Sequence, residues 1–150
     1  MKPLPMAISV PCHTVALIAA SNSKGVFEMI TAKEIKEAKK KVRLQDSHHE
    51  HYDCILIAYE WLDAQKKTKK PRNIPHELKD LIERWAGRYV SLGDIEVAAC
   101  LHPSVIGNYP FYNISSQLTE PSINRLKNIG EALTQGQNEE HQAKDYRFHE

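Results

Sequence analysis

The clearest pattern in the chain is a set of segments in which apolar residues recur every three or four positions. Residues 52–65 have apolar side chains at positions 52, 55, 56, 59 and 62, a spacing that places them on one face of an α-helix. Residues 73–86 repeat this spacing, and residues 91–101 form a short apolar segment typical of a buried helix. Gly87 lies between the last two segments, where it favours a helix end. The pattern therefore predicts three packed helices in the middle of the chain.

Residues typical of helix starts precede each of these segments and two others. Ser or Thr followed three residues later by an acidic residue occurs at positions 31 and 34, 47 and 50, and 91 and 94. Asn73 with Pro75, and Thr119 with Pro121, are compatible with a first helical turn that contains proline. Helices are therefore expected from residue 31 to about 45, after residue 47, after residue 73, after residue 91, and from residue 119 to 133.

These elements predict a mainly α fold, a compact bundle of four or five helices over residues 31–133. A chain of 150 residues is long enough for one domain with its own core. Residues 1–30 contain three prolines and no sustained period, which predicts an irregular N-terminal arm. Residues 134–150 are nearly all polar, which predicts a disordered C-terminal tail.

Basic residues are concentrated in the first half of the chain, although the total net charge is only +1. Residues 1–72 carry 13 basic and 8 acidic side chains, whereas residues 73–150 carry 7 and 11. One basic segment lies on the predicted helix at residues 33–43, and the other is the connector at residues 66–72. Each could be a solvated surface, but together they favour contact with nucleic-acid phosphates. The expected contact residues are Lys39, Lys40, Lys41, Arg43, Lys66, Lys67, Lys69, Lys70 and Arg72.

The chain has no recognisable catalytic motif, so we expect a protein that is not an enzyme and needs no cofactor. No G-x-S-x-G sequence and no glycine-rich phosphate loop are present. Cys12, Cys54 and Cys100 lie far apart among apolar residues, which favours reduced thiols in a cytoplasmic protein. The apolar residues 14–20 are too few to span a bilayer, so no membrane partner is expected.

Three histidines near residue 50 raise a metal site as an alternative. His48, His49 and His51 are close in sequence to Glu50 and Asp53, and such residues bind first-row metals. On one helix, however, adjacent positions point about 100° apart, so the segment offers at most two ligands on a face. A metal-dependent hydrolase stays an alternative, but we expect a solvated helix start and no metal.

A helix-turn-helix is a second alternative, over residues 77–101. The turn after Gly87 has a suitable length. The second helix would nevertheless present Asp94 and Glu96 where bases should be read, and its other residues are apolar. Two core helices are the preferred interpretation.

One block of sequence resembles a known family. Residues 85–91 (WAGRYVS), 94–99 (DIEVAA), 101–103 (LHP), 109–111 (YPF) and 118–122 (LTEPS), with 61–65 (WLDAQ) upstream, are similar to small proteins of temperate enterobacterial phages. The block resembles the phage replication B protein family, over residues 52–135.

This resemblance implies a non-enzymatic DNA-replication accessory protein that binds and helps load the host replicative helicase and contacts single-stranded DNA. The aromatic residues of the block then suit a partner-binding surface, whereas Trp85 is expected in the core. A small phage regulator or inhibitor that binds duplex DNA or another host protein is the alternative function. The expected partner-binding residues are Tyr89, Tyr109, Phe111 and Tyr112.

Overall fold

The protein is mostly α-helical, as predicted, with short strands only. The computed structural model describes residues 31–41 and 50–150. The expected arm at residues 1–30, and with it Cys12, as well as Arg43, His48 and His49, therefore lie outside the described residues. Within the described part, the helices and strands are α3 (Ala32–Lys41), α4 (Tyr52–Ala64), α5 (Leu78–Ala86), α6 (Leu92–Leu101), β1 (Gly107–Asn108), β2 (Phe111–Tyr112), β3 (Thr119–Glu120), the 3-10 helices η2 (Ile123–Leu126), η3 (Gln137–Glu140) and η4 (Ala143–Asp145), and β4 (Phe148–His149).

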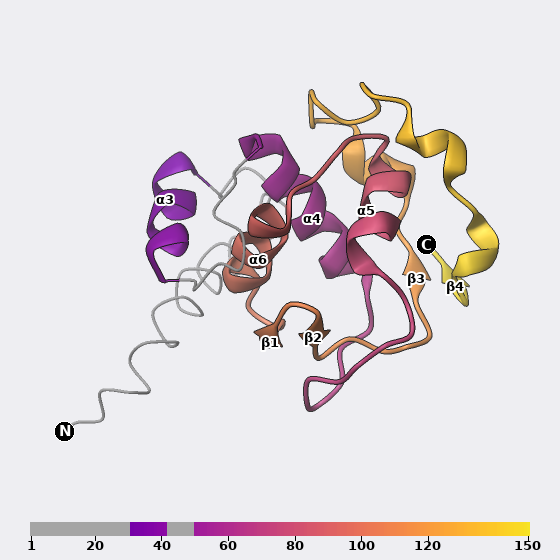
Figure 1. Ribbon diagram of the computed structural model, residues 1–150, viewed down its shortest axis with the longest axis horizontal. Coiled ribbons are helices and arrows are strands. Elements are labelled where there is room, and N and C mark those ends of the chain that lie inside the picture. The colour runs from indigo at the N-terminus through magenta and orange to yellow at the C-terminus, as the bar shows by residue number, and fades with distance from the viewer. Residues whose placement is uncertain (1–30, 42–49) are drawn as a thin grey trace.

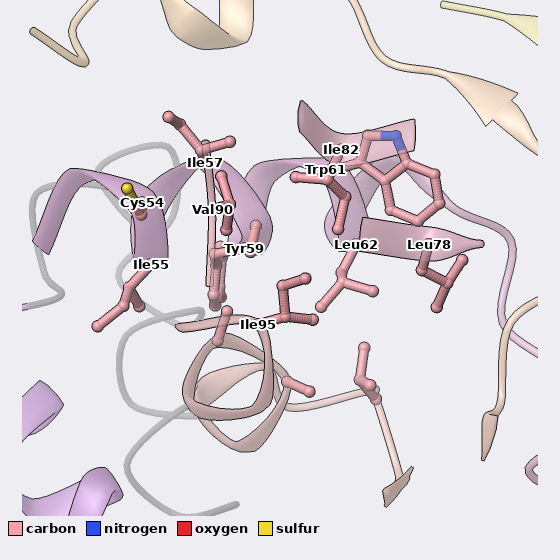
Figure 2. Packing of buried hydrophobic residues seen from close by; sticks show 14 of the residues in the cluster. Cys54, Ile55, Ile57, Tyr59, Trp61, Leu62, Leu78, Ile82, Val90 and Ile95 are labelled. Atoms are coloured by element: carbon pink, nitrogen blue, oxygen red, sulfur yellow. The ribbon is translucent and has the colours of Figure 1, made fainter. Parts of the chain in front are cut away.

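Helix α4 is the centre of the molecule, because apolar residues lie on most of its circumference and α6 and α5 both pack against it (Figure 1). Figure 2 shows Trp61 and Leu62 of α4 meeting Leu78 and Ile82 of α5, with Ile95 of α6 on the other side of the cluster. All five side chains are buried. The helix starts at Tyr52 because the side chain of His51 accepts a hydrogen bond from the Asp53 amide.

The expected ends of α5 and α6 are confirmed. Gly87 ends α5 in the left-handed conformation, with φ 62°. Ser91 caps α6, since its hydroxyl accepts a hydrogen bond from the Asp94 amide. Eight of the ten residues of α6 are buried, so this helix belongs to the core and cannot enter a DNA groove. The helix-turn-helix alternative is therefore excluded for residues 77–101.

Helix α3 forms as its sequence predicts. The Glu34 amide donates to the Thr31 hydroxyl and the Thr31 amide donates to the Glu34 carboxylate, which is the reciprocal bonding of a capping box. Its apolar residues Ile35 and Ala38 are buried, and α3 packs against α6. In Figure 1 it lies at the left edge, beyond α6.

The predicted fifth α-helix over residues 119–133 is wrong. Residues 119–120 form β3, and only Ile123–Leu126 form a short 3-10 helix. Asn128 and Gly130 are weak helix formers. The backbone near residue 119 instead pairs with residues at the end of the chain, a contact that local sequence does not reveal.

The predicted disorder of residues 134–150 is also wrong, because these residues pack along α5 and β3. Strand β4 pairs in parallel with β3, and η3 lies against α5. Tyr146 is buried and accepts a hydrogen bond from the indole of Trp61 at 3.1 Å. Glu150 forms two hydrogen bonds of 2.7 Å with the guanidinium of Arg125. Residues 134–150, which we call the C-terminal segment, are therefore ordered although they are mostly polar, and Tyr146 is their buried aromatic residue.

One of the expected thiols is confirmed. Cys54 is a free, fully buried thiol. Each helix in residues 31–41 and 50–150 is too short or too polar to cross a bilayer.

Candidate nucleic-acid interface

The connector at residues 66–72 is held against the hairpin of β1 and β2. The Thr68 amide donates to the carbonyl of Asn113 at 2.8 Å, and the Arg72 amide donates to the carbonyl of Tyr112 at 3.1 Å. Lys67 also forms an isolated antiparallel bridge with Ile114. The connector is therefore joined to the hairpin by backbone hydrogen bonds, and it lies along the lower edge of the molecule in Figure 1.

Asn113 fixes the connector relative to the hairpin. Its amide nitrogen donates to the carbonyls of Thr68 and Ser104 at 3.1 and 2.9 Å, and its oxygen accepts from the Ile106 amide at 2.7 Å. The residue is buried, so these bonds are protected from water. In the sequence, the only signal of this role is the position of Asn113 among turn residues.

Gly107 allows the hairpin to close tightly. Its φ is 110°, and a Cβ atom at this position would lie 2.2 Å from the carbonyl oxygen of Phe111 and 3.2 Å from the Pro71 side chain. Glycine is therefore required both by the backbone conformation and by the close approach. As a result Phe111, at the start of β2, is held directly beside the connector.

This packing brings together residues with two different expected functions, contact with nucleic acid and binding of a protein partner. Lys69, Lys70 and Arg72 are exposed, and they form no ion pair with a described carboxylate. Phe111 is 50% exposed, so half of this large apolar side chain is open to solvent. We call these four residues the basic–aromatic patch.

Lys67 does not belong to the patch, contrary to the prediction. Its ammonium group donates to the carbonyls of Leu62, Asp63 and Gln65 at 2.6 to 3.2 Å and so caps the end of α4. Burial lowers the pKa of Lys67 to about 8. Lys66 is exposed, and its ammonium lies 3.5 Å from the centre of the Phe148 ring. Both cations are thus occupied by contacts within the protein.

Two of the four residues expected to bind a partner, Tyr109 and Tyr112, are buried. Tyr112 is 1% exposed, and Tyr109 is 7% exposed with its hydroxyl donating to the Glu77 carboxylate at 2.8 Å. The rings of the two tyrosines meet edge to face and support the hairpin from within. Tyr89 is half-buried, with the Lys79 ammonium 4.4 Å from its ring centre. Phe111 is the member of the set that presents most of its ring to solvent.

The second basic segment lies elsewhere on the molecule. Lys39 and Lys40 are on α3, and the Lys39 ammonium faces the ring of Tyr52 at 5.5 Å. Lys41 ends the helix, and Arg43 falls outside the described residues. Because α3 and the connector occupy different edges in Figure 1, the two segments do not form one continuous patch within the described residues.

Elsewhere in the described residues, clusters of polar side chains stabilise the fold. Arg125 joins Glu60, Asp63 and Glu150 with bonds of 2.7 to 2.9 Å. Burial would raise the pKa of Asp63, but hydrogen bonds from His102 and Arg125 lower it below its ordinary value. Burial raises the pKa of Cys54 to about 12, so this thiol stays protonated at neutral pH and is a poor nucleophile.

The one described member of the histidine cluster, His51, serves as the cap of α4. Residues 31–41 and 50–150 contain no group of three or more His, Cys, Asp or Glu side chains arranged to hold a metal ion.

Comparisons with known proteins found no relative: no family model, no curated protein and no solved structure matches the chain.

Proposed function

We propose that this protein is a non-enzymatic, phage-type DNA-replication accessory protein that contacts single-stranded DNA through the basic–aromatic patch and helps to load the host replicative helicase. The observation that carries the DNA-binding part is that the exposed Phe111 and the exposed Lys69, Lys70 and Arg72 lie on two segments, the hairpin and the connector, that are hydrogen-bonded to each other. The helicase part is supported by the resemblance of residues 52–135 to the phage replication B proteins.

The patch has the two features that sequence-independent binding of single strands requires. An exposed aromatic ring can stack on any base, and such stacking contributes about 1–3 kcal/mol per base. Each lysine or arginine that neutralises a phosphate releases counterions, which makes affinity depend on salt. The three cations lie within four consecutive residues, 69–72, of a segment that is hydrogen-bonded to the hairpin, so they can contact neighbouring phosphates of one strand.

Single strands fit this surface better than a duplex does. Reading a duplex usually requires a helix or a two-stranded ribbon inserted into the major groove. The helix suggested for that role, α6, is buried, and β1 and β2 are two residues long. An unpaired base can instead reach Phe111 directly.

The DNA-binding part is tested by fluorescence anisotropy with a labelled oligothymidine of about 20 nucleotides, measured between about 50 and 200 mM salt. Lys69→Glu with Lys70→Glu should weaken binding and reduce the salt slope by about 1.4, because two phosphate contacts are lost. Lys127→Glu with Lys144→Glu reverses two exposed cations outside the patch and is the matched control. Equal losses in both pairs would show a general charge effect and contradict the proposal.

Phe111→Ser separates stacking from charge. This variant should lose about 1–3 kcal/mol of binding free energy while the salt slope stays unchanged, since no cation is removed. Unfolding in urea should confirm that the exposed substitution leaves the fold intact. Wild-type affinity in Phe111→Ser would remove base stacking from the proposal.

The helicase part requires a separate experiment. The tagged protein should recover the replicative helicase from bacterial lysate both with and without nuclease, with identification by mass spectrometry. Recovery only when DNA is intact would mean that the two proteins share a DNA molecule and do not bind each other. Recovery of a different host protein in both samples would favour the inhibitor function.

A further inference from the structure

A hollow of about 580 Å³ lies between α5 and the C-terminal segment. Its lining combines five polar residues with four apolar ones, and we call it the apolar hollow after the latter, which are Trp85, Pro121, Ile123 and Leu133. Ile123 is 56% exposed and Leu133 is 48% exposed. Leu133 has a φ of 63°, a conformation that side chains other than glycine rarely adopt, and its amide is held by the Ala86 carbonyl at 2.7 Å. The fold thus keeps two large apolar side chains at the mouth of a hollow.

A second hollow, of about 410 Å³, lies against α5 and η3 and is lined by four carboxylates and one guanidinium. Its lining residues Arg84 and Glu139 are adjacent in the chain to Trp85 and Asn138, which line the first hollow. Glu83 is paired with Lys79 at 2.7 Å, but Asp80, Glu139 and Glu140 form no ion pair with any described residue. We call these three residues the acidic rim. An occupant of the two hollows should therefore carry a bulky apolar side chain with cations beside it.

The chain itself carries such a surface. In the basic–aromatic patch, Phe111 supplies the apolar side chain, and Lys69, Lys70 and Arg72 supply cations without described acidic partners. The patch lies at the lower edge in Figure 1, whereas the C-terminal segment lies at the right. The basic–aromatic patch and the apolar hollow with its acidic rim therefore lie on different parts of one molecule. Each can contact the complementary surface of another copy.

We propose that the protein associates head to tail, with the basic–aromatic patch of one copy seated in the apolar hollow and acidic rim of the next. The two surfaces differ, so the contact is heterologous and each copy can bind two others. A small contact with charged edges gives weak association that salt dissociates. This inference rests on the proposed function in one respect: single-stranded DNA and a second copy compete for the same patch.

Sedimentation velocity of the full chain at low salt and high protein concentration tests the contact. Wild type should form species larger than dimers. Phe111→Ser keeps the apolar hollow but loses the apolar side chain that enters it, and Leu133→Asn keeps the patch but loses part of the hollow. Asn is chosen because it tolerates the left-handed backbone at this position. Each variant alone should be monomeric.

The decisive sample is an equal mixture of these two variants. One intact patch and one intact hollow then remain, so the mixture should form dimers and nothing larger. Tyr52→Asn, which also removes a large exposed side chain but from neither surface, should assemble like wild type. A monomeric wild type, variants that assemble alone, or a mixture that stays monomeric would each overturn the head-to-tail contact.

Adding the oligothymidine to assembled wild type tests the competition. Dissociation to DNA-bound monomers is the expected result. Assemblies that persist while DNA is bound would overturn the shared use of the patch. If the oligothymidine does not bind even at protein concentrations below assembly, the proposed function fails, and the variant mixture still decides whether the copies associate.

Discussion

Individual hydrogen bonds connect the C-terminal segment to the core, and the one between Trp61 and Tyr146 is the most deeply placed. Both side chains are buried, and the indole nitrogen lies 3.1 Å from the tyrosine hydroxyl. Tyr146→Phe would leave a buried N–H group without its acceptor, so the free energy of unfolding should fall by about 1–3 kcal/mol. Urea denaturation measures the change. Lys144→Ala, at an exposed position of the same segment, should change stability by less than about 0.5 kcal/mol; an equally small change in Tyr146→Phe would contradict the predicted contribution of this bond.

The burial of Lys67 should make the free energy of unfolding depend on pH. Burial lowers its pKa from the ordinary 10.5 to about 8, so the unfolded chain holds this proton more tightly than the folded protein does. Stability contributed by this residue should therefore rise as the pH increases from about 8 to about 10.5. Lys67→Met removes the group and is the reference, since all other titrations are shared. The unfolding free energy of wild type minus that of Lys67→Met should increase across this window; a constant or falling difference would contradict the burial.

At the scale of elements, the C-terminal segment is the part whose removal is most informative. Truncation after Leu133 exposes Trp61, removes β4 from β3, and takes Glu150 away from Arg125. We expect a loss of at least about 3 kcal/mol of unfolding free energy, because an apolar contact and a partly buried ion pair are lost together. Glu139→Ala with Glu140→Ala alters exposed residues of the same segment and should leave stability nearly unchanged. A truncated chain as stable as wild type would mean that the segment contributes nothing to the fold.

The elements that the sequence predicted well are those specified by nearby residues. The reciprocal bonds of Thr31 and Glu34, the cap of Ser91 and the left-handed Gly87 are all local interactions, and each is present. The start of α5 was predicted too early: the helix begins at Leu78 and leaves Pro75 outside it. The errors after residue 119 arise because the partner of β3 lies almost 30 residues further along the chain.

The candidate site was predicted in parts but not as a whole. Lys69, Lys70 and Arg72 were identifiable from charge, and Phe111 from the resemblance, yet nothing in the sequence indicated that they are neighbours. Their proximity depends on the bonds that Asn113 makes to two distant segments. The other differences between the expected and the observed site come from burial. Tyr109, Tyr112 and Lys67 have the residue types of a binding surface but contact the interior.

For the whole molecule, the asymmetry of charge along the chain becomes an asymmetry in space. The exposed cations of the connector lie at one edge with Phe111, and the acidic rim lies along α5 and η3. Such separation should orient an approaching polyanion toward the connector and away from the C-terminal segment. It also gives the head-to-tail contact between copies its direction.

Ultraviolet cross-linking would map where single-stranded DNA touches the 150-residue chain. An oligothymidine of about 20 nucleotides with bromodeoxyuridine at internal positions would be cross-linked by ultraviolet light at low protein concentration, and the modified peptides identified by mass spectrometry. If the basic–aromatic patch binds single strands, cross-links should form to Phe111 and to the connector at residues 66–72. Cross-links confined to α3 or to the C-terminal segment, with none at the connector or the hairpin, would contradict binding at this patch.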